Sequence, residues 1–235
     1  YNPVKNKYYL LYALFRNGNY DKALELAEDL AKKLENGHNW LRINDVYVLT
    51  LLHSGHYRRA MQVVQEVFTN RNFIRLSEHD KLKWSLNYGF LLITGVERTY
   101  VKGKSLNQVF EIIPDRDGQD FQMNLAIVVL QLALAVLEGK MDAIKELARE
   151  MSYYIYKHPV ATYSPRSRMF LKLVNVMLKY DMDTKVCKKK GRYLYQQLKN
   201  TGHFGDAYSD MEVLPYEVLW EIFMERVEQE TVNVA

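Results

Sequence analysis

The sequence has little proline, glycine and cysteine, and each shortage excludes a class of protein. Five prolines and 11 glycines in 235 residues are too few for the many turns of an all-β fold. Cys187 is the only cysteine, so no disulfide can form within the chain. A chain without disulfides is typical of a reducing compartment, and we therefore expect the protein in the cytoplasm.

Long apolar runs are missing as well. The longest extends from Leu125 to Leu137 with Gln131 inside it, well short of the roughly 18 residues that a membrane span needs. We therefore expect no membrane partner, and an apolar run of this length predicts a buried core helix. No targeting segment is visible. The chain begins with Tyr1 instead of Met, which is compatible with the C-terminal part of a longer protein.

The sequence also has no large excess of positive or negative charge. The net charge of +4 and the isoelectric point near 8.9 are only mildly basic, which does not indicate nucleic acid unless the cations gather in one place. The hydrophobic fraction of 48% is ordinary for a folded domain. Tyrosine, in contrast, is plentiful, and most of the 18 tyrosines lie within helical patterns.

One short pattern occurs twice and organises the first part of the chain. Three residues recur at an offset of 37 positions: Gly18, Tyr20 and Ala23 return as Gly55, Tyr57 and Ala60. An apolar helical stretch precedes each copy and an amphipathic one follows, as in a helix–turn–helix unit. We expect the glycine to end the first helix with a positive φ. Small residues such as Ala23 and Ala27 would then let the two helices approach closely.

The pattern predicts one all-α domain over residues 1–235, a solenoid of antiparallel helix pairs. Start and stop signals place the units at about 4–36, 41–70, 77–113, 120–158 and 164–199, with a capping helix at 215–230. Ser77 to Asp80 has capping-box spacing, and Ser164-Pro165 combines an N-cap with proline at the first helical position. The segment from Gly95 to Gly118 predicts a long loop with a short helix at 106–110, which is either functional or a docking point.

These units resemble the tetratricopeptide repeat, a helix pair of about 34 residues. The resemblance depends on the following positions of the first two units: Leu10, Gly18, Tyr20, Ala23 and Ala27, then Tyr47, Gly55, Tyr57 and Ala60. Trp84 is similar to the aromatic residue that opens a repeat, and Gly139 and Ala148 match more weakly. The resemblance implies a right-handed α-solenoid that acts as a protein-binding scaffold and not as an enzyme.

In this family the first helices of the pairs line a concave groove that binds peptides. Carried over by position, the groove residues are Lys5, Tyr8, Tyr12, Phe15 and Arg16 in the first unit, and Arg42, Asp45, Leu49, Leu52 and His53 in the second. The resemblance thus implies a protein or peptide partner at an aromatic-rich surface. Members that hold chaperone tails use a clamp of Lys, Asn and Arg. We do not expect that partner, because the clamp positions here are Tyr8, Tyr12, Val46, Leu82 and Leu86.

A lysine run is the sharpest local feature of the second half. Lys185, Lys188, Lys189, Lys190 and Arg192 occur close together with no acidic residue among them. On a helix, four of these cations form one stripe with two tyrosines adjacent to it: Lys185, Lys188, Lys189 and Arg192, with Tyr193 and Tyr195. The alternative function is phosphate contact on nucleic acid, but the favoured interpretation is the solvated face of a helix.

No catalytic, metal or cofactor site is predicted. His53 and His56 flank one turn but have no further ligands nearby, and residues 115–120 resemble a calcium loop without its glycine and glutamate positions. Gly139-Lys140 lacks the upstream glycine of a phosphate loop. Cys187 is either a reactive thiolate or, as we favour, an ordinary half-buried thiol. An enzyme site in the loop from Gly95 to Gly118 has no support beyond the length of that loop.

Overall fold

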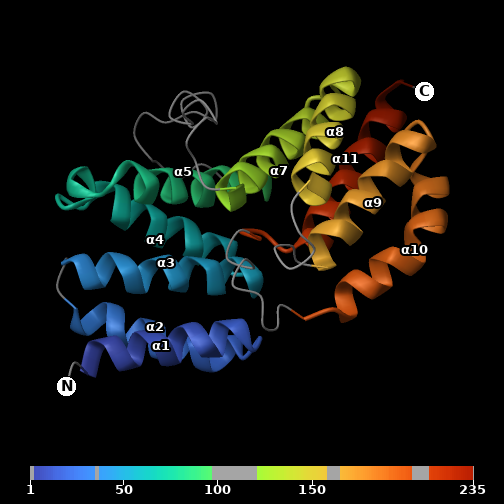
Figure 1. Cartoon of the computed structure of the whole chain (residues 1–235). Coiled ribbons are helices and arrows are strands. Elements are labelled where there is room, and N and C mark those ends of the chain that lie inside the picture. The colour runs from blue at the N-terminus through green and yellow to red at the C-terminus, as the bar shows by residue number, and fades with distance from the viewer. Residues whose placement is uncertain (1–2, 35–36, 97–120, 158–164, 203–211, 235) are drawn as a thin grey trace. The chain divides into compact units, whose positions relative to one another are not determined.

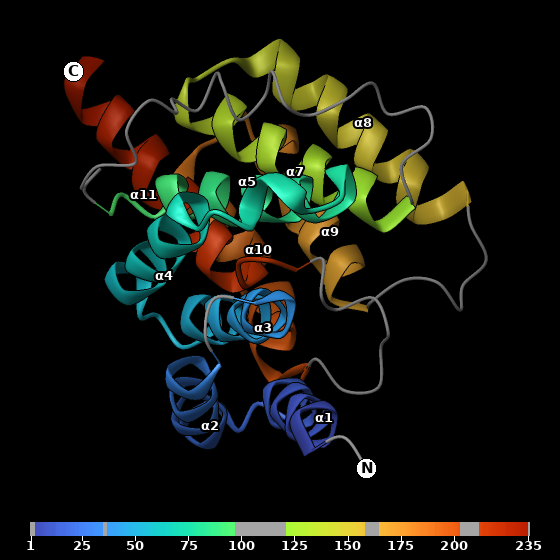
Figure 2. The ribbon, with the colours of Figure 1, turned by 90° about the vertical axis from the view of Figure 1, so that its left-hand side faces the viewer.

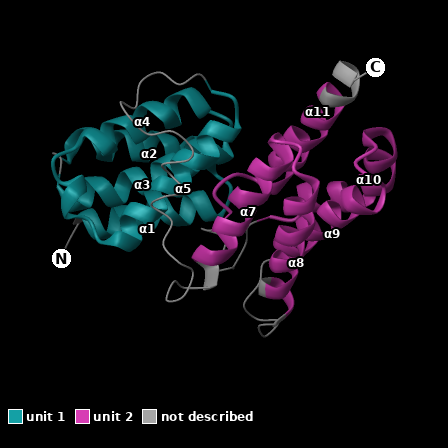
Figure 3. Cartoon of the chain, turned by 90° about the horizontal axis from the view of Figure 1, so that it is seen from above, with its two compact units in different colours: residues 1–116, 203–205 teal, residues 117–202, 206–235 magenta. Residues whose placement is uncertain are grey.

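The structure is a computed structural model that describes residues 3–34, 37–96, 121–157, 165–202 and 212–234 (Figure 1). Within these ranges the chain is all α-helical, apart from one 3-10 turn, and contains no strand. The contacts between helices group them into two units, which Figure 3 shows in different colours. Unit 1 holds α1 to α5 and unit 2 holds α7 to α11, and each is described by itself. The prediction of a single domain over residues 1–235 stays a prediction.

Unit 1 is a series of helical hairpins in which each helix packs on the next. Its elements are α1 (Pro3–Arg16), α2 (Tyr20–Lys33), α3 (His38–His53), α4 (Tyr57–Thr69), the 3-10 turn η1 (Phe73–Arg75) and α5 (Glu78–Ile93). The first helices of successive pairs also touch, since α1 packs on α3 and α3 on α5. Figure 2 shows α1, α2 and α3 nearly end-on, as neighbours within this unit. The first two predicted helix pairs are thus confirmed, with α3 beginning three residues earlier than expected.

The hairpin turns have the glycine geometry that the repeat pattern predicts. Gly18 and Gly55 have φ of 69° and 78°, a left-handed conformation that costs glycine little because it has no Cβ. After each glycine, a backbone N–H reaches back to a carbonyl of the first helix: Asn19 donates to Leu14 at 2.9 Å and His56 to Leu51 at 2.8 Å. This hydrogen bond is the helix-ending Schellman motif, which satisfies a carbonyl that the helix leaves unpaired. The two turns are therefore the same structure.

Small residues form the seam between the helices of unit 1. Ala23, Ala27 and Ala60 have no exposed surface. A larger side chain at these positions would push the helices apart or force its neighbours from their preferred rotamers. The third pair begins as predicted, because the Ser77 hydroxyl accepts a hydrogen bond from the Asp80 N–H at 3.1 Å and caps α5. The short helix predicted at 106–110 and most of the predicted loop lie outside the described residues.

Unit 2 has the same kind of hairpin but a different arrangement of neighbours. Its helices are α7 (Phe121–Leu137), α8 (Met141–Lys157), α9 (Pro165–Lys179), α10 (Thr184–Asn200) and α11 (Tyr216–Val234). The turn at Gly139 repeats the Schellman motif, with the Lys140 N–H donating to Ala135 O at 2.9 Å. The last helix, α11, packs against three others, α7, α9 and α10. The last helix of unit 2 therefore contacts three helices of its unit, whereas α5, the last described helix of unit 1, packs on α4 and α3.

The apolar run of α7 is buried, as predicted. Met123 to Leu130 are buried without a break, and only Gln131, Leu134 and Leu137 are half-buried. None of the described helices has the length and apolarity that crossing a membrane requires. On α8, the predicted inward positions Ile144, Ala148, Met151 and Ile155 are buried, while Leu147 is half-buried.

Gly191 allows α10 to come close to two other helices. A Cβ built at this position would lie 3.0 Å from Cδ2 of Leu173 on α9 and 3.3 Å from Cζ2 of Trp220 on α11. The sequence alone marks this glycine as a weak point of the helix, because glycine lowers helix propensity. The structure supplies a compensating reason, which is close packing of three helices at one point.

Candidate binding surfaces

The first candidate surface lies on the first helices of the unit 1 pairs, and we call it the A-helix face. It comprises Lys5, Tyr8, Tyr12 and Arg16 of α1, Arg42, Asp45 and His53 of α3, and Lys83 of α5. Its most defined part is at the start of α1, where the Arg42 guanidinium lies 4.8 Å from the centroid of the Tyr8 ring. A cation over an aromatic face at this distance is attracted to it, so Arg42 and Tyr8 join α1 to α3.

Two shallow depressions flank Arg42 on this face. One, of about 120 Å³, is lined by residues of α1 and α3: Val4, Lys5, Tyr8, Tyr9, Asn39, Arg42 and Ile43. The other, of about 40 Å³, extends toward α5 and includes Asp45, Asp80, Lys83 and Trp84. Lys83 Nζ lies 2.8 Å from Asp45 Oδ2, which ties α5 to α3. The groove residues were predicted only for the first two units, so Lys83 was not among them. Lys83 lies on α5, the first helix of the third pair, and extending the same positions to that helix could have suggested it.

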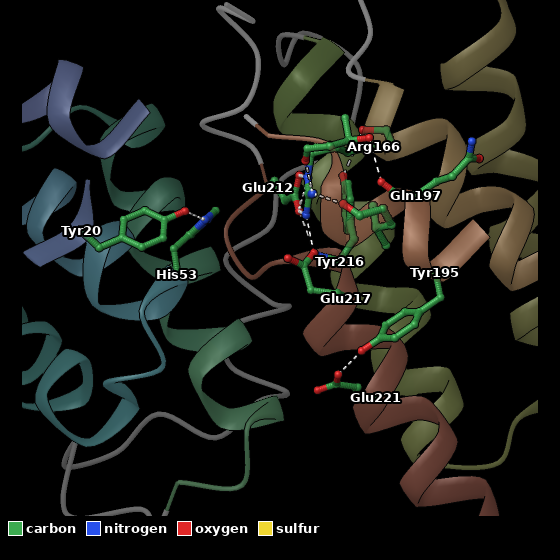
Figure 4. Close-up of polar contacts among 12 residues, drawn as sticks. Tyr20, His53, Arg166, Tyr195, Gln197, Glu212, Tyr216, Glu217 and Glu221 are labelled. Atoms are coloured by element: carbon green, nitrogen blue, oxygen red, sulfur yellow. Dashed lines mark hydrogen bonds and ion pairs between the residues drawn. The ribbon is translucent and has the colours of Figure 1, made fainter. Parts of the chain in front are cut away.

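The far half of the A-helix face is held by aromatic contacts. The Arg16 guanidinium lies 5.7 Å from the Tyr12 ring centroid, and its Nη1 donates to the Tyr12 hydroxyl at 3.4 Å. The His53 ring meets the Phe15 ring edge-on at 5.1 Å, and its Nδ1 lies 3.5 Å from the Tyr20 hydroxyl (Figure 4). These contacts fix His53 at the corner of the first hairpin.

Three predicted groove residues form the floor of this face and not its surface. Phe15 and Leu49 are buried, at 3% and 4% exposed, and Leu52 is fully buried. Lys5 and Arg42 are exposed, while Tyr8, Tyr12, Arg16, Asp45 and His53 are half-buried. The charges of the face are mainly positive: Lys5, Arg16 and Arg42 are cations, and Lys83 and Asp45 form an ion pair with each other. The face therefore offers cations and tyrosine rings to a partner.

The second candidate surface is the basic stripe on α10, defined as Lys185, Lys188, Lys189 and Arg192. All four side chains are exposed, and the opposite face of the helix buries Cys187, Gly191 and Leu198. Lys188 is paired with Glu228 of α11, with Nζ and Oε1 2.6 Å apart. Lys185, Lys189 and Arg192 follow one another at helical spacing over about 10 Å of helix, at roughly 1.5 Å per residue. The stripe predicted from the sequence is thus present on one exposed face.

Two tyrosines flank the basic stripe and differ in environment. Tyr193 is 71% exposed, and its hydroxyl accepts a hydrogen bond from Gln197 Nε2 at 2.8 Å. Tyr195 is half-buried and donates to a carboxylate oxygen of Glu221 on α11 (Figure 4). Burial and the nearby Glu221 carboxylate raise the pKa of Tyr195. Only Tyr193 therefore presents most of its ring beside the cations.

The sole cysteine lies beneath the stripe and is buried. Cys187 has no exposed surface, and its Sγ lies 3.9 Å from Val176 O. Burial raises the pKa of the thiol, and the Asp183 carboxylate raises it further. Both effects oppose formation of a thiolate, so Cys187 is an ordinary core thiol and not a nucleophile.

A buried ionic cluster in unit 2 is the polar feature that the sequence did not indicate. Arg166 of α9 is 2% exposed and binds the Glu212 carboxylate with both sides of its guanidinium: Nε–Oε2 is 2.9 Å and Nη2–Oε1 is 2.7 Å. Its Nη2 also donates to Glu217 of α11, and its Nη1 donates to the carbonyls of Leu198 and Thr201, each at 2.6 Å (Figure 4). One side chain thus joins three helices.

The surroundings of this cluster show why it is stable. The Tyr216 N–H donates to Glu212 Oε1 at 2.9 Å, which places that carboxylate at the start of α11, where helix N–H groups favour negative charge. The Tyr216 ring stacks on Phe170 at 4.6 Å, and its hydroxyl lies 3.2 Å from Ser167 Oγ. Burial raises the pKa of Glu217, although the Arg166 cation opposes the shift. With its polar groups paired inside the core, the cluster holds α9, α10 and α11 together.

The remaining candidate groups have local partners. Ser54 Oγ lies 2.9 Å from His56 Nδ1, while His53 contacts Phe15 and Tyr20. Across the ranges that the structure describes, no three His, Cys, Asp or Glu side chains are grouped to hold a metal ion. The calcium-loop-like segment at 115–120 falls outside those ranges. In comparisons with known proteins, no family model, curated protein or solved structure matches this chain.

Proposed function

We propose that the protein is a non-enzymatic binding module of tetratricopeptide-like, right-handed solenoid form, with α11 as its C-terminal cap. Its A-helix face would hold a peptide or a segment of a partner domain. The observation that supports this most is the depression at Tyr8 and Arg42, where two helices offer an aromatic ring, a stacked guanidinium and the exposed Lys5. Tyrosine and arginine are the residue types that contribute most binding energy at interfaces.

The charge of the face suggests the chemistry of the partner. Four cations, Lys5, Arg16, Arg42 and Lys83, are arranged over three helices. Two carboxylates lie near them: Asp45 is paired with Lys83, and Asp80 accepts a hydrogen bond from the Ser77 hydroxyl. Carboxylates bind arginine through two parallel hydrogen bonds, which gives geometric selectivity as well as energy. We therefore infer an acidic peptide segment with apolar or aromatic residues that pack on Tyr8 and Tyr12.

A peptide-display selection on the full chain tests this proposal. Peptides selected from a random library should be enriched in Asp and Glu, and their binding should be weakened at least tenfold by Arg42→Glu. The matched control is Arg149→Glu, which makes the same charge change on an exposed helix position of unit 2 outside both candidate surfaces. Circular dichroism would show that both variants keep their helices. Selection without acidic enrichment, or equal binding by Arg42→Glu, would show that the site is elsewhere.

A second candidate function is nucleic-acid binding by the basic stripe. The specific observation in its favour is that Lys185, Lys189 and Arg192 are all exposed on one face, beside the exposed ring of Tyr193. Cations can neutralise phosphates and an aromatic ring can stack on a base.

Salt titration of binding to a single-stranded oligonucleotide tests the second function. Each phosphate contact that is lost should lower the slope of log affinity against log salt by about one. Lys189→Glu should therefore reduce both affinity and slope, whereas Lys32→Glu on unit 1 should change neither. The absence of binding by the wild-type protein at low salt would exclude this function.

A further inference from the structure

The outward face of α1 has exposed apolar residues at positions that are buried on the other first helices of unit 1. We define the α1 end face as Tyr9, Leu10 and Ala13. Tyr9 and Leu10 are 55% and 54% exposed, and Ala13 is exposed as well. Apolar side chains this exposed at adjacent positions form a surface that another element can cover.

The next repeat shows what the same positions do when a neighbour is present. At the repeat offset of 37 positions, the counterparts of the α1 end face on α3 are Val46, Tyr47 and Thr50. All three are buried, with Tyr47 only 1% exposed. On α5, the positions at the same distance before the turn glycine are Leu86, Asn87 and Phe90, and these are buried too. The equivalent positions are thus buried on α3 and α5 and exposed on α1.

Among these positions on α3, Tyr47 contacts α2, and its hydroxyl also accepts a hydrogen bond from Arg59 Nε of α4 at 3.3 Å. The Tyr47 hydroxyl donates to Glu28 Oε1 of α2 at 2.8 Å, so this side of α3 faces the second helix of the preceding pair. That helix buries Ala23, Ala27 and Leu30, and its four carboxylates outnumber its three lysines: Asp21, Glu25, Glu28 and Asp29 against Lys22, Lys32 and Lys33. The element that packs on this side of α3 is therefore amphipathic, with small apolar residues in its stripe and carboxylates beside it.

The α1 end face could be covered by a second copy of the chain or by a helix that resembles α2, and the charges of α1 favour the second. Between Pro3 and Arg16, α1 has Lys5, Lys7 and Arg16 and no acidic residue, and Lys5 Nζ lies 5.8 Å from the Tyr9 ring centroid. A second copy docked through α1 would bring these cations together, and like charges at an interface oppose binding. A helix that resembles α2 would instead place carboxylates near them.

We propose that the α1 end face docks an amphipathic helix whose apolar stripe is flanked by carboxylates, in the way that α2 packs on α3. This surface is separate from the A-helix face, and the inference does not depend on the function proposed for that face. Docking would bury Tyr9 and Leu10 and extend the array of helices by one layer.

The test uses the full chain and a defined probe, a hydrocarbon-stapled peptide with the α2 sequence, Tyr20 to Lys33. NMR titration should show saturable binding with shifts centred on Tyr9, Leu10 and Ala13. Leu10→Glu should weaken the binding at least tenfold, because it places a carboxylate in the apolar contact and beside the carboxylates of the probe. Tyr9→Glu is the second variant at the same face. Ile74→Glu is the matched control, since Ile74 is also an exposed apolar residue, on η1.

Three outcomes would overturn the proposal. The first is the absence of probe binding by the wild-type chain at millimolar concentration. The second is equal binding by the wild-type chain and by both end-face variants, provided that circular dichroism shows them folded. The third is wild-type self-association in sedimentation experiments that Leu10→Glu abolishes, because the occupant of the face would then be a second copy of the chain.

Discussion

Unit 1 and unit 2 are both built from helical hairpins, yet they treat charged groups in opposite ways. Unit 1 packs its helices through alanines, and its ion pairs, such as Lys33 with Asp29 and Lys83 with Asp45, are exposed or half-buried. Unit 2 buries Arg166 with Glu212 in its core and uses them to hold the last helix. Stability in unit 1 should therefore depend on side-chain volume, and in unit 2 on charge pairing.

The largest expected effect is the loss of the buried cation. Arg166→Met keeps an apolar stem but leaves the Glu212 and Glu217 carboxylates without their cation. Breaking a buried ion pair in this way costs about 3–5 kcal/mol. Urea unfolding followed by circular dichroism should show this loss. The control, Lys188→Met, removes an exposed pair and should cost less than about 1 kcal/mol. A similar small loss in both variants would mean that the cluster does not hold unit 2 together.

A smaller effect is expected in the alanine seam of unit 1. Ala23→Leu inserts extra volume where the wild-type side chain has no exposed surface, and overpacking of this kind costs about 1–3 kcal/mol. Lys32→Leu, at an exposed position of the same helix, should leave the free energy of unfolding nearly unchanged. Thermal and urea unfolding would measure both. If Ala23→Leu lowered the free energy of unfolding no more than its control does, the stability of unit 1 would not depend on close approach of α1, α2 and α3.

The smallest effect concerns pH and is confined to unit 2. Because burial raises the pKa of Glu217 above its ordinary value of 4.5, the folded state binds this proton more tightly than the unfolded state does. The resulting stabilisation is complete below pH 4.5 and is lost as the pH rises through the raised pKa. The free energy of unfolding of the wild type, relative to Glu217→Gln, should therefore fall as the pH rises above 4.5. A flat or rising difference would contradict this expectation.

The sequence predicted the parts of the fold that depend on local chemistry. Turn glycines such as Gly18 and Gly55 need only their own backbone freedom and a carbonyl a few residues earlier, so a short pattern reveals them. Ala23 and Ala27 follow from helical periodicity, and so does burial of α7. These features recur within one hairpin, which is why they can be recognised without knowledge of distant contacts.

Features that depend on distant contacts could not be predicted in the same way. Arg166 and Glu212 are 46 positions apart, and nothing in the residues around either one indicates a buried pair. Gly191 looks like a helix breaker until Leu173 and Trp220 are seen beside it. Phe15 and Leu49 fall at groove positions by register, but the packing of neighbouring helices decides that they are buried. The identity of a binding residue could be guessed, whereas its accessibility could not.

The burial of Cys187 makes the protein convenient for spectroscopic work. Because the one native thiol is inaccessible and its pKa is raised, maleimide reagents should leave it unmodified while the protein is folded. A single cysteine introduced at an exposed position, such as Ala13 or Lys185, would then carry a spin label or fluorophore alone. Pairs of such labels would give distances between the two units in solution without any need to remove the natural cysteine.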